Sequence, residues 1–421
     1  MSTLTLTLRD AVRLALAPQG NLAVDEADQS VAAGRARLRG AQAASKPNVD
    51  FSFNAVNQRL DLDVFGFQAI RVPGFTFPRT VGPFELLESQ VHVRQNLFSQ
   101  ANTRRRDVER AGIVAAQTET DVVRDQIVAQ IARLYFQAQR DASAVETARS
   151  LVGSAEMTLK EIGNRNTQGE ALGLDVAQAR IEVSAAKQDL LKAELEKART
   201  EMELLNAMNV DLHTPLQLTE ALTFAAQDSP PIEQAVATAM QSRWEVVALQ
   251  KKLQAAHLND LAIHAERLPT LDAYANGGSR GTSFANSTGT YDAGVTLRIP
   301  ILDGGRRESQ RTEVITVIRR QELQLARLRK QVEIEVRESL LRIELARGYV
   351  ELSESRFKAA KDLLDHRQRS YAQGVGSQIE VNGAQAFLAK AEDGRVAALQ
   401  GWNQARVDLM QALGTIRGLA Q

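Results

Sequence analysis

The sequence predicts a mainly α-helical protein with a small β portion, in which one structural unit occurs twice. Three observations support this prediction: two very long tracts without proline, two halves that align with each other, and four short segments of alternating polarity. A chain of 421 residues is long enough for two or three ordinary domains or for one large duplicated unit.

The proline-free tracts predict very long helices. Between Pro83 and Pro215 lie 131 residues without proline, and another 121 residues follow Pro300. Because proline costs about 3 kcal/mol in a helix interior, these tracts are free to remain helical. Apolar residues recur in them at three- and four-residue steps, as at Ile127 and Ile131, which is the pattern of a packed helical seam.

Each long tract is interrupted once by a glycine-bearing turn. The first turn reads NRNTQGEALGLDVAQAR, around Gly169 and Gly173, and the second reads RSYAQGVGSQIEVNGAQ, around Gly374 and Gly376. We therefore expect two helical hairpins. Arms of roughly 65 residues would each be about 100 Å long at 1.5 Å per residue.

The two halves of the chain are copies of one unit. The two turn segments align without gaps at an offset of 205 residues. Upstream of them, QVHVRQNLFSQANTR aligns with GVTLRIPILDGGRRE at an offset of 204, and KPNVDF aligns with LPTLDA at an offset of 222. The first copy therefore carries an insertion of 18 residues between its two alternating segments. Such regular duplication predicts a repeated structural unit.

The alternating segments predict strands. Val49, Phe51 and Phe53 alternate with Asp50 and Ser52, and the other three segments show the same period of two. Their lengths, near ten residues, are those of tilted strands in a membrane barrel, but two amphipathic hairpins of a soluble α+β domain fit the alternation equally well. Eight of the 13 phenylalanines lie within residues 51–98, which favours a membrane band with interfacial aromatic side chains.

These patterns predict the domain organisation. The first repeat is expected at residues 1–209, with a helix, a strand at 48–57, a loop at 58–86, a strand at 88–98 and a hairpin whose tip lies near 164–176. A linker in the equatorial region follows at 210–230. The second repeat is expected at 231–415, with a helix, a strand at 270–277, a loop at 278–289, a strand at 290–300 and a tip near 369–381, before a C-terminal tail at 416–421.

Four strands cannot close a membrane barrel alone. Open strand edges are not tolerated in hydrocarbon, and membrane barrels begin at about eight strands. If the strands cross a membrane, the chain must therefore oligomerise. No stretch approaches 18 consecutive apolar residues, so a transmembrane helix is not expected.

Composition argues against several classes of function. Lys+Arg and Asp+Glu both number 51, so no net field attracts nucleic acid. The chain has no cysteine, its five histidines are scattered, and neither HExxH, GxSxG nor a phosphate-binding glycine motif occurs. Asp303, before Gly304 and Gly305, is interpreted as a helix cap. We expect no enzyme activity, no catalytic residue, no cofactor, no metal site and no nucleic-acid partner.

The N-terminal segment MSTLTLTLRDAV has neither a basic region nor an apolar core, so it is not a signal peptide. If the protein is exported, we expect the sequence to be the mature chain without its signal peptide.

The order of helix, strand, loop, strand and long helical hairpin, given twice, resembles the TolC-type outer-membrane efflux protein family over nearly the whole chain. The segment RIPILDGGRRESQ at 298–310 is similar to that family's passage from strand into helix, and RNTQGEALGLDV and SYAQGVGSQIEV resemble its paired tip turns. The resemblance implies the outer-membrane factor of a tripartite efflux or type I secretion system: a homotrimer with an α-barrel and a 12-stranded transmembrane β-barrel.

The resemblance also implies where such a protein works and with what. Its location is the outer membrane, in contact with lipid and spanning into the periplasm. Its tips dock onto a periplasmic membrane-fusion adaptor and, through it, an inner-membrane pump. Such proteins are passive conduits without a catalytic centre.

Carried over by position, the resemblance places adaptor docking at the two tips. These residues are Gly169, Leu172, Leu174, Asp175, Val176, Tyr371, Gly374, Ser377, Ile379 and Val381. It assigns Glu380, with Asp175, to the pore constriction, where three copies would form a carboxylate ring that favours cations. An ordinary solvated helix acid is the alternative for Glu380. Two positions depart from the family pattern: Gly383 replaces a second acid, and Gly376 replaces an arginine that latches the closed gate.

Two other classes of function fit parts of the sequence. A soluble coiled-coil scaffold would explain the long helices and the missing signal peptide, although it would not explain the phenylalanine-rich strands. A periplasmic adaptor also has a helical hairpin, but it normally has only one.

Overall fold

The computed structural model describes residues 3–67, 70, 72–225 and 230–420. They form two compact units. The helical unit contains residues 1–30, 116–250 and 323–421, and the sheet unit contains residues 31–115 and 251–322. Each sequence repeat contributes to both units, because the long helices α3 (Gln100–Thr167) and α7 (Arg306–Ala372) each include residues of both.

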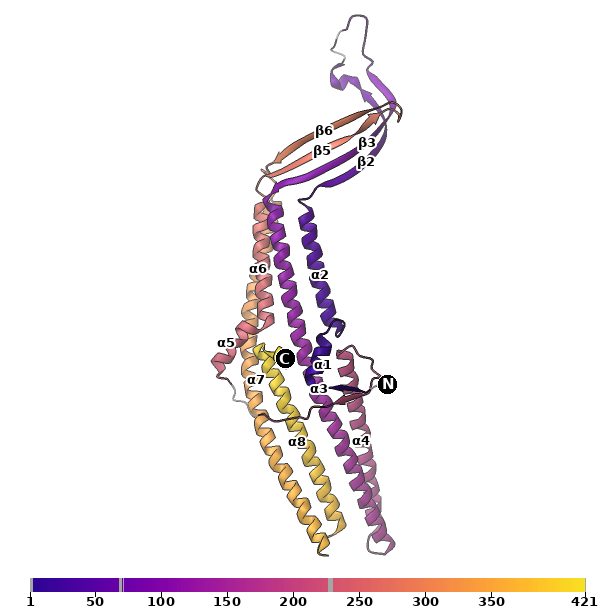
Figure 1. The fold of residues 1–421 in the computed structure, drawn as a ribbon, viewed down its shortest axis with the longest axis vertical. Helices are drawn as coiled ribbons and strands as arrows, with labels where there is room; N and C mark the ends of the chain where they lie inside the picture. The colour runs from indigo at the N-terminus through magenta and orange to yellow at the C-terminus, as the bar shows by residue number, and fades with distance from the viewer. Residues whose placement is uncertain (1–2, 68–69, 71, 226–229, 421) are drawn as a thin grey trace. The chain divides into compact units, whose positions relative to one another are not determined.

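The same succession of elements occurs in both halves of the chain (Figure 1). The first half contains β1 (Leu4–Leu6), α1 (Leu8–Leu16), α2 (Leu22–Ala43), β2 (Asn48–Asp61), β3 (Thr80–Ser99), α3 and α4 (Gly173–Ala207). The second half contains β4 (Leu216–Leu218), α5 (Ile232–Ser242), α6 (Trp244–Ala265), β5 (Thr270–Gly281), β6 (Ser287–Arg298), α7 and α8 (Gln378–Leu413). The predicted fold class, mainly α with a small β portion, is confirmed, and the four expected strands are β2, β3, β5 and β6; the short strands β1 and β4 were not expected.

The sheet unit is built around one antiparallel sheet of four strands. Their order is β2-β3-β5-β6, so the returning strand of the first half, β3, pairs with the first strand of the second half, β5. Strands β2 and β6 are the two edges, and each has one neighbour among the described residues.

Strands β2 and β3 extend beyond the segments that alternation indicates. Their ladder continues to the pair Asp61–Thr80, so the connection covers residues 62–79 rather than the expected 58–86. The sequence disguises this extension because Gly82 and Pro83 lie within β3. A register shift between Gln58 and Leu60 falls opposite them, where a bulge accommodates a proline that has no N–H to donate.

Strands β5 and β6 also differ from the expected ranges of 270–277 and 290–300. Their ladder runs from Thr270–Arg298 to Gly281–Ser287, which leaves a connection of only residues 282–286 in place of the expected 278–289. Glycine at 278 is part of the strand because the neighbouring strand is close: a β-carbon there would lie 2.8 Å from the Cα of Gln90. Strand β6 ends at Arg298 because β5 offers no partner before Thr270.

The helical unit consists of two antiparallel hairpins with the short N-terminal elements packed against them. Its largest core cluster includes Val12 of α1, Ile131 and Tyr135 of α3, and Leu204 of α4, all fully or almost fully buried. The Tyr135 hydroxyl donates to the backbone carbonyl of Leu6 (3.1 Å). Strand β1 pairs in parallel with β4, which lies in the expected linker 210–230, and alternation does not indicate strands of three residues.

Within the part of the chain that the structure describes, no helix is both long enough and apolar enough to cross a bilayer.

Truncation of the core of the helical unit should destabilise the protein. Ile131 has no exposed surface, so Ile131→Ala should lower the free energy of unfolding by about 2–5 kcal/mol. The measurement is urea denaturation in detergent, followed by circular dichroism at 222 nm. Val64→Ala, at a site that is 82% exposed, is the control and should leave the midpoint unchanged; equal effects of both substitutions would contradict this assignment of the core.

Candidate functional site

Both hairpin tips are built by the same backbone geometry. Gly169 and Gly374 follow the first arm of their hairpins and have positive φ angles of 80° and 72°. Each glycine N–H donates to a carbonyl three residues earlier, that of Asn166 or Tyr371, at 3.0 Å. Glycine adopts this left-handed conformation without the steric cost of a side chain, so it ends a helix and turns the chain back.

The second arm of each hairpin starts with a capping acid. The carboxylate of Asp175 accepts the backbone N–H of Leu172 (2.9 Å). In the second tip, Glu380 accepts the N–H of Ser377 (3.4 Å), while the Ser377 hydroxyl accepts the N–H of Glu380 (3.3 Å). Both acids therefore satisfy helix N-terminal groups that would otherwise lack a partner.

Glu380 has a second partner that the sequence does not indicate. Its carboxylate lies 3.4 Å from the guanidinium of Arg367, near the end of α7 in the same hairpin. Gly376 lies close to this pair, since a β-carbon there would come within 3.4 Å of the Glu380 carboxylate. Gly383 faces open space. The Glu380 carboxylate is thus held by Arg367, which lies seven residues before Gly374 and outside the tip motif.

The two tips are in contact. Ile379 of the second tip lines a hollow of about 360 Å³ together with Asp175 and other residues of the first hairpin. The buried Asn382 of α8 donates to the Thr158 hydroxyl of α3 (3.2 Å).

The predicted tip residues differ in accessibility. Val176 and Ile379 are half-buried and Val381 is buried; those that are exposed are Gly169, Leu172, Leu174, Asp175, Tyr371, Gly374, Ser377 and Glu380.

The four-stranded sheet exposes an apolar face. Tyr291 is 90% exposed and Phe51 is 69% exposed. The register places them on one face together with other exposed side chains: Val49 and Phe53 of β2, Val91 of β3, and Val295 and Leu297 of β6. A soluble sheet buries its apolar face, so a contiguous apolar face left open indicates contact with lipid or with another protein.

The opposite face of the sheet is polar and carries a hydrogen-bonded row across all four strands. The Ser52 hydroxyl contacts His92 Nε2 (2.9 Å), and His92 Nδ1 contacts the Asn276 amide oxygen (2.8 Å). The Asn276 amide nitrogen then donates to the Asp292 carboxylate (2.9 Å). Sequence reasoning missed this row because it depends on the register between the two halves. A continuous polar row of this kind suits a water-filled interior.

Several further ionic contacts support the structure. Arg417, after α8, pairs with Asp125 (2.6 Å) and Asp121 (3.1 Å) of α3. Burial raises the pKa of the Asp125 carboxyl, against the opposing effect of the Arg417 hydrogen bond. Asp303 accepts the backbone N–H of Arg307 (3.1 Å) and also its guanidinium N–H, and these hydrogen bonds hold the Asp303 pKa below its usual value. The interpretation of Asp303 as a helix cap is confirmed.

Among the described residues, no group of three or more histidine, aspartate or glutamate side chains is arranged to hold a metal ion.

The chain matches the sequence pattern of outer membrane efflux proteins over residues 14–210 and 235–415, which is most of its length and both repeats. The chain belongs to the outer membrane efflux protein family. The family consists of passive channel proteins, and this chain is accordingly an outer-membrane efflux channel. The two alternatives, a soluble coiled-coil scaffold and a periplasmic adaptor, are therefore set aside.

Solved structures of outer-membrane channels share the fold. The CmeC channel of Campylobacter jejuni superposes with a TM-score of 0.81 at 14% identity, covering 97% of this chain and 85% of that chain. The VceC protein of Vibrio cholerae gives 0.73 at 17% identity, with 97% and 96% covered. The MtrE channel of Neisseria gonorrhoeae, solved in its open state, gives 0.73 at 16% identity, with 97% and 88% covered. A search of curated proteins by sequence finds no match.

Loss of the Ser377 cap should loosen the second tip of the channel. Ser377→Ala removes the hydroxyl that accepts the Glu380 N–H, which costs about 1 kcal/mol at a helix N-terminus. Hydrogen exchange at residues 378–382 should be faster by about fivefold. Ser377→Asp keeps a capping oxygen and should retain the slow exchange; equal acceleration in both variants would contradict the capping role.

Proposed function

We propose that the chain is one of three identical subunits of an exit duct in the outer membrane. The duct conducts substrates passively from an inner-membrane pump, across the periplasm and the outer membrane, as part of a tripartite efflux or secretion system. The observation that carries the proposal is the four-stranded sheet, because it has an exposed apolar face, a polar face and two open edges.

The open edges support an assembly of several chains. In hydrocarbon, each unpaired backbone group of β2 and β6 would cost several kcal/mol. Pairing β6 of one copy with β2 of the next satisfies both edges, and three copies give a closed barrel of twelve strands. The apolar face then contacts lipid, and the polar row lines the lumen.

The hairpins offer two matching apolar surfaces. On α4, an exposed stripe follows helical spacing through Ile181, Leu191, Leu195 and Met202. On α7, a second exposed stripe contains Leu341, Leu345, Tyr349 and Leu352. Long exposed stripes with spacings of three, four and seven residues are typical of coiled-coil contacts. Different surfaces on the two hairpins form a head-to-tail contact, which closes into a ring when copies repeat.

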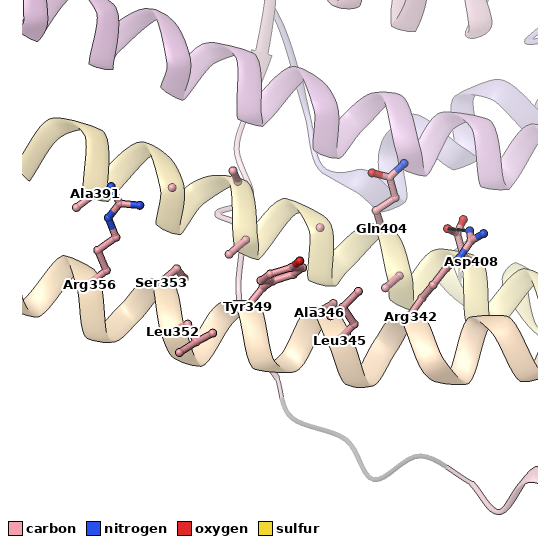
Figure 2. A pocket seen from close by; sticks show the side chains of 15 residues that line it. Arg342, Leu345, Ala346, Tyr349, Leu352, Ser353, Arg356, Ala391, Gln404 and Asp408 are labelled. Carbon is pink, nitrogen blue, oxygen red and sulfur yellow. Dashed lines mark ion pairs between the residues drawn. The ribbon is translucent and has the colours of Figure 1, made fainter. Parts of the chain in front are cut away.

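The stripe on α7 borders a groove that fits a helix. The groove has a volume of about 680 Å³, and small residues of α8 line its floor: Ala391, Gly394, Ala397, Ala398, Gly401 and Ala405. Figure 2 shows Leu345 and Tyr349 on α7 beside this surface, with Arg342 directed towards Asp408 of α8. Small side chains on one helix beside large ones on the next allow close packing of a third helix, which we assign to α4 of a second copy.

The tips are proposed as the docking site for a periplasmic adaptor. Leu172, Leu174 and Tyr371 are exposed there, next to the capping acids. Helix α3 has 68 residues and corresponds to about 100 Å at 1.5 Å per residue, a length suited to a duct that spans into the periplasm. Glu380 and Asp175 are proposed to line the pore, with Glu380 restrained by Arg367.

A charge placed in the α7 stripe should prevent assembly. Leu345→Lys would bury an unpaired ammonium group in the contact, so the detergent-solubilised protein should shift from three chains of 46.2 kDa to one. Light scattering with size-exclusion chromatography measures the mass. Val64→Lys, in the β2–β3 connection, is the control and should stay assembled. A wild-type protein that is monomeric in detergent would contradict the duct.

Removal of the tip carboxylate should weaken cation selectivity. Glu380→Gln removes one charge per subunit at the proposed constriction and should lower the cation-to-anion permeability ratio by about twofold or more. The reversal potential in a KCl gradient across a planar bilayer gives this ratio. Glu354→Gln is matched, because Glu354 also pairs with an arginine, Arg395, on the neighbouring helix. Equal shifts in both variants would remove Glu380 from the constriction.

A further inference from the structure

The polar face of the sheet contains a hollow whose charged lining is mostly basic. It has a volume of about 670 Å³ and lies where the ends of β2, β3, β5 and β6 meet the adjoining helices. Its charged residues are Lys46, Arg94, Arg298 and Asp272; these four, with Tyr274, are named the basic pocket below.

The strand register brings these side chains together from both halves of the chain. Arg94 of β3 lies opposite Tyr274 of β5, and Asp272 of β5 lies opposite Thr296 of β6, two residues before Arg298. Arg94, Tyr274, Asp272 and Arg298 belong to the same face as the polar row. Each lies an even number of residues along its own strand from a member of that row, which is His92, Asn276 or Asp292.

Tyr274 forms one wall of the pocket because its neighbour is a glycine. A β-carbon at Gly294, the residue opposite, would lie 2.9 Å from the Tyr274 hydroxyl oxygen and 3.1 Å from the ring carbon that bears it. The tyrosine side chain therefore lies over Gly294, in space that any larger residue would occupy. This position keeps the phenol beside the basic side chains.

The positive charges in the pocket outnumber the negative ones by three to one. Lys46, Arg94 and Arg298 are exposed, and none of them has an ion-pair partner among the residues that the structure describes. The carboxylate of Asp272 accepts a hydrogen bond from the Asn96 amide instead (2.8 Å). Three cations thus share one hollow with a single carboxylate.

The other charges on this face lie further along the strands. Asp50 is opposite His92 in the ladder, and Asp292 accepts the Asn276 amide, so both belong to the row beyond Arg94. Further still, Arg280 lies 3.8 Å from Glu88, so that pair is balanced. Positive charge therefore collects at the end of the sheet nearest the helices.

Such an arrangement attracts a mobile anion. Like charges around one hollow repel each other, and an anion placed among them replaces repulsion with attraction. Guanidinium groups bind carboxylates and phosphates through two parallel hydrogen bonds, and the Asn48 amide and the Tyr274 hydroxyl supply further donors. The hollow, at about 670 Å³, is large enough for a multivalent organic anion.

We propose that the basic pocket binds small anions that carry carboxylate or phosphate groups as they pass through the lumen. The proposal rests on the proposed duct for the statement that this face lines the lumen, but binding itself depends only on the pocket. Three copies would place three basic pockets around the channel, forming a positively charged zone at the helix-side end of the barrel. The channel would then favour anionic substrates at this level.

The test uses citrate as the probe and the full-length protein in detergent. Isothermal titration calorimetry at low ionic strength should show citrate binding to the wild type. Arg94→Gln should weaken it by about tenfold, as expected for loss of a charge-assisted hydrogen bond, and Arg94→Gln with Arg298→Gln should weaken it further. Arg280→Gln is the matched control, since it removes the same charge from the same face but outside the pocket, and should change affinity by less than about twofold.

A second measurement separates the pocket from the duct. In planar bilayers of phosphatidylcholine, which bears no net charge, citrate should reduce the conductance of the wild type, and Arg94→Gln should relieve the block. Absence of citrate binding, or equal weakening by Arg94→Gln and Arg280→Gln, would overturn the proposal. Citrate binding without any conductance would support the pocket and contradict the proposed duct. Conductance without citrate binding would support the proposed duct and contradict anion binding in the basic pocket.

Discussion

Backbone hydrogen bonding at the edges of the sheet is the constraint on which the rest of the structure depends. Strands β2 and β6 each have one neighbouring strand within the described part of the chain, yet the face they share is apolar and exposed. Water can satisfy an open edge, but hydrocarbon cannot. If the apolar face lies in hydrocarbon, as proposed, the sheet is complete only when its edges meet those of another copy. Under that proposal, the requirement for an assembly follows from the strands alone.

The helices also expose surfaces that suit contact with a second copy. Both α4 and α7 expose apolar stripes, and these are the surfaces proposed to meet hairpins of the next copy. Ion pairs between the two hairpins of one chain join the other two arms: Arg133 of α3 pairs with Asp408 of α8 (2.7 Å), and Arg140 of α3 pairs with Asp393 of α8 (3.1 Å). Polar contacts thus join α3 to α8 within the chain, while the apolar stripes remain for a neighbour.

Much of the fold could be predicted from the sequence because it depends on local rules. Absence of proline and the spacing of apolar residues predict the long helices, and left-handed glycines such as Gly169 and Gly374 predict where they turn. The strand limits could not be predicted in the same way. Gly278 and Pro83 are residue types typical of loops, but both lie in strands. Gly278 is close to the backbone of the neighbouring strand, and Pro83 lies opposite a register shift in its partner strand. These causes lie in the partner strand.

The candidate sites also differ in whether a local sequence motif contains all of their residues. The capping roles of Asp175 and Glu380 lie within three residues of their partners, so a local motif contains them. The pairing of Glu380 with Arg367 crosses the hairpin, and the row from Ser52 to Asp292 crosses the two repeats, so neither has a signature in a contiguous segment. A duplicated chain makes such sites common, because β3 and β5 belong to different repeats yet lie side by side.

The restraint on Glu380 bears on how the tip could open. Its carboxylate is engaged at once by the Ser377 N–H and by Arg367, and all three residues belong to one hairpin. A hairpin can therefore move as a body without breaking either contact. Gly376 and Gly383 have no side chains, so neither position places a second charged group beside Glu380. Within the chain, the second hairpin is also tied to the first, because the buried Asn382 of α8 donates to the Thr158 hydroxyl of α3. The contacts of Glu380 lie within one hairpin, whereas the Asn382–Thr158 hydrogen bond joins the two hairpins, so a movement of one hairpin relative to the other breaks the second contact and spares the first.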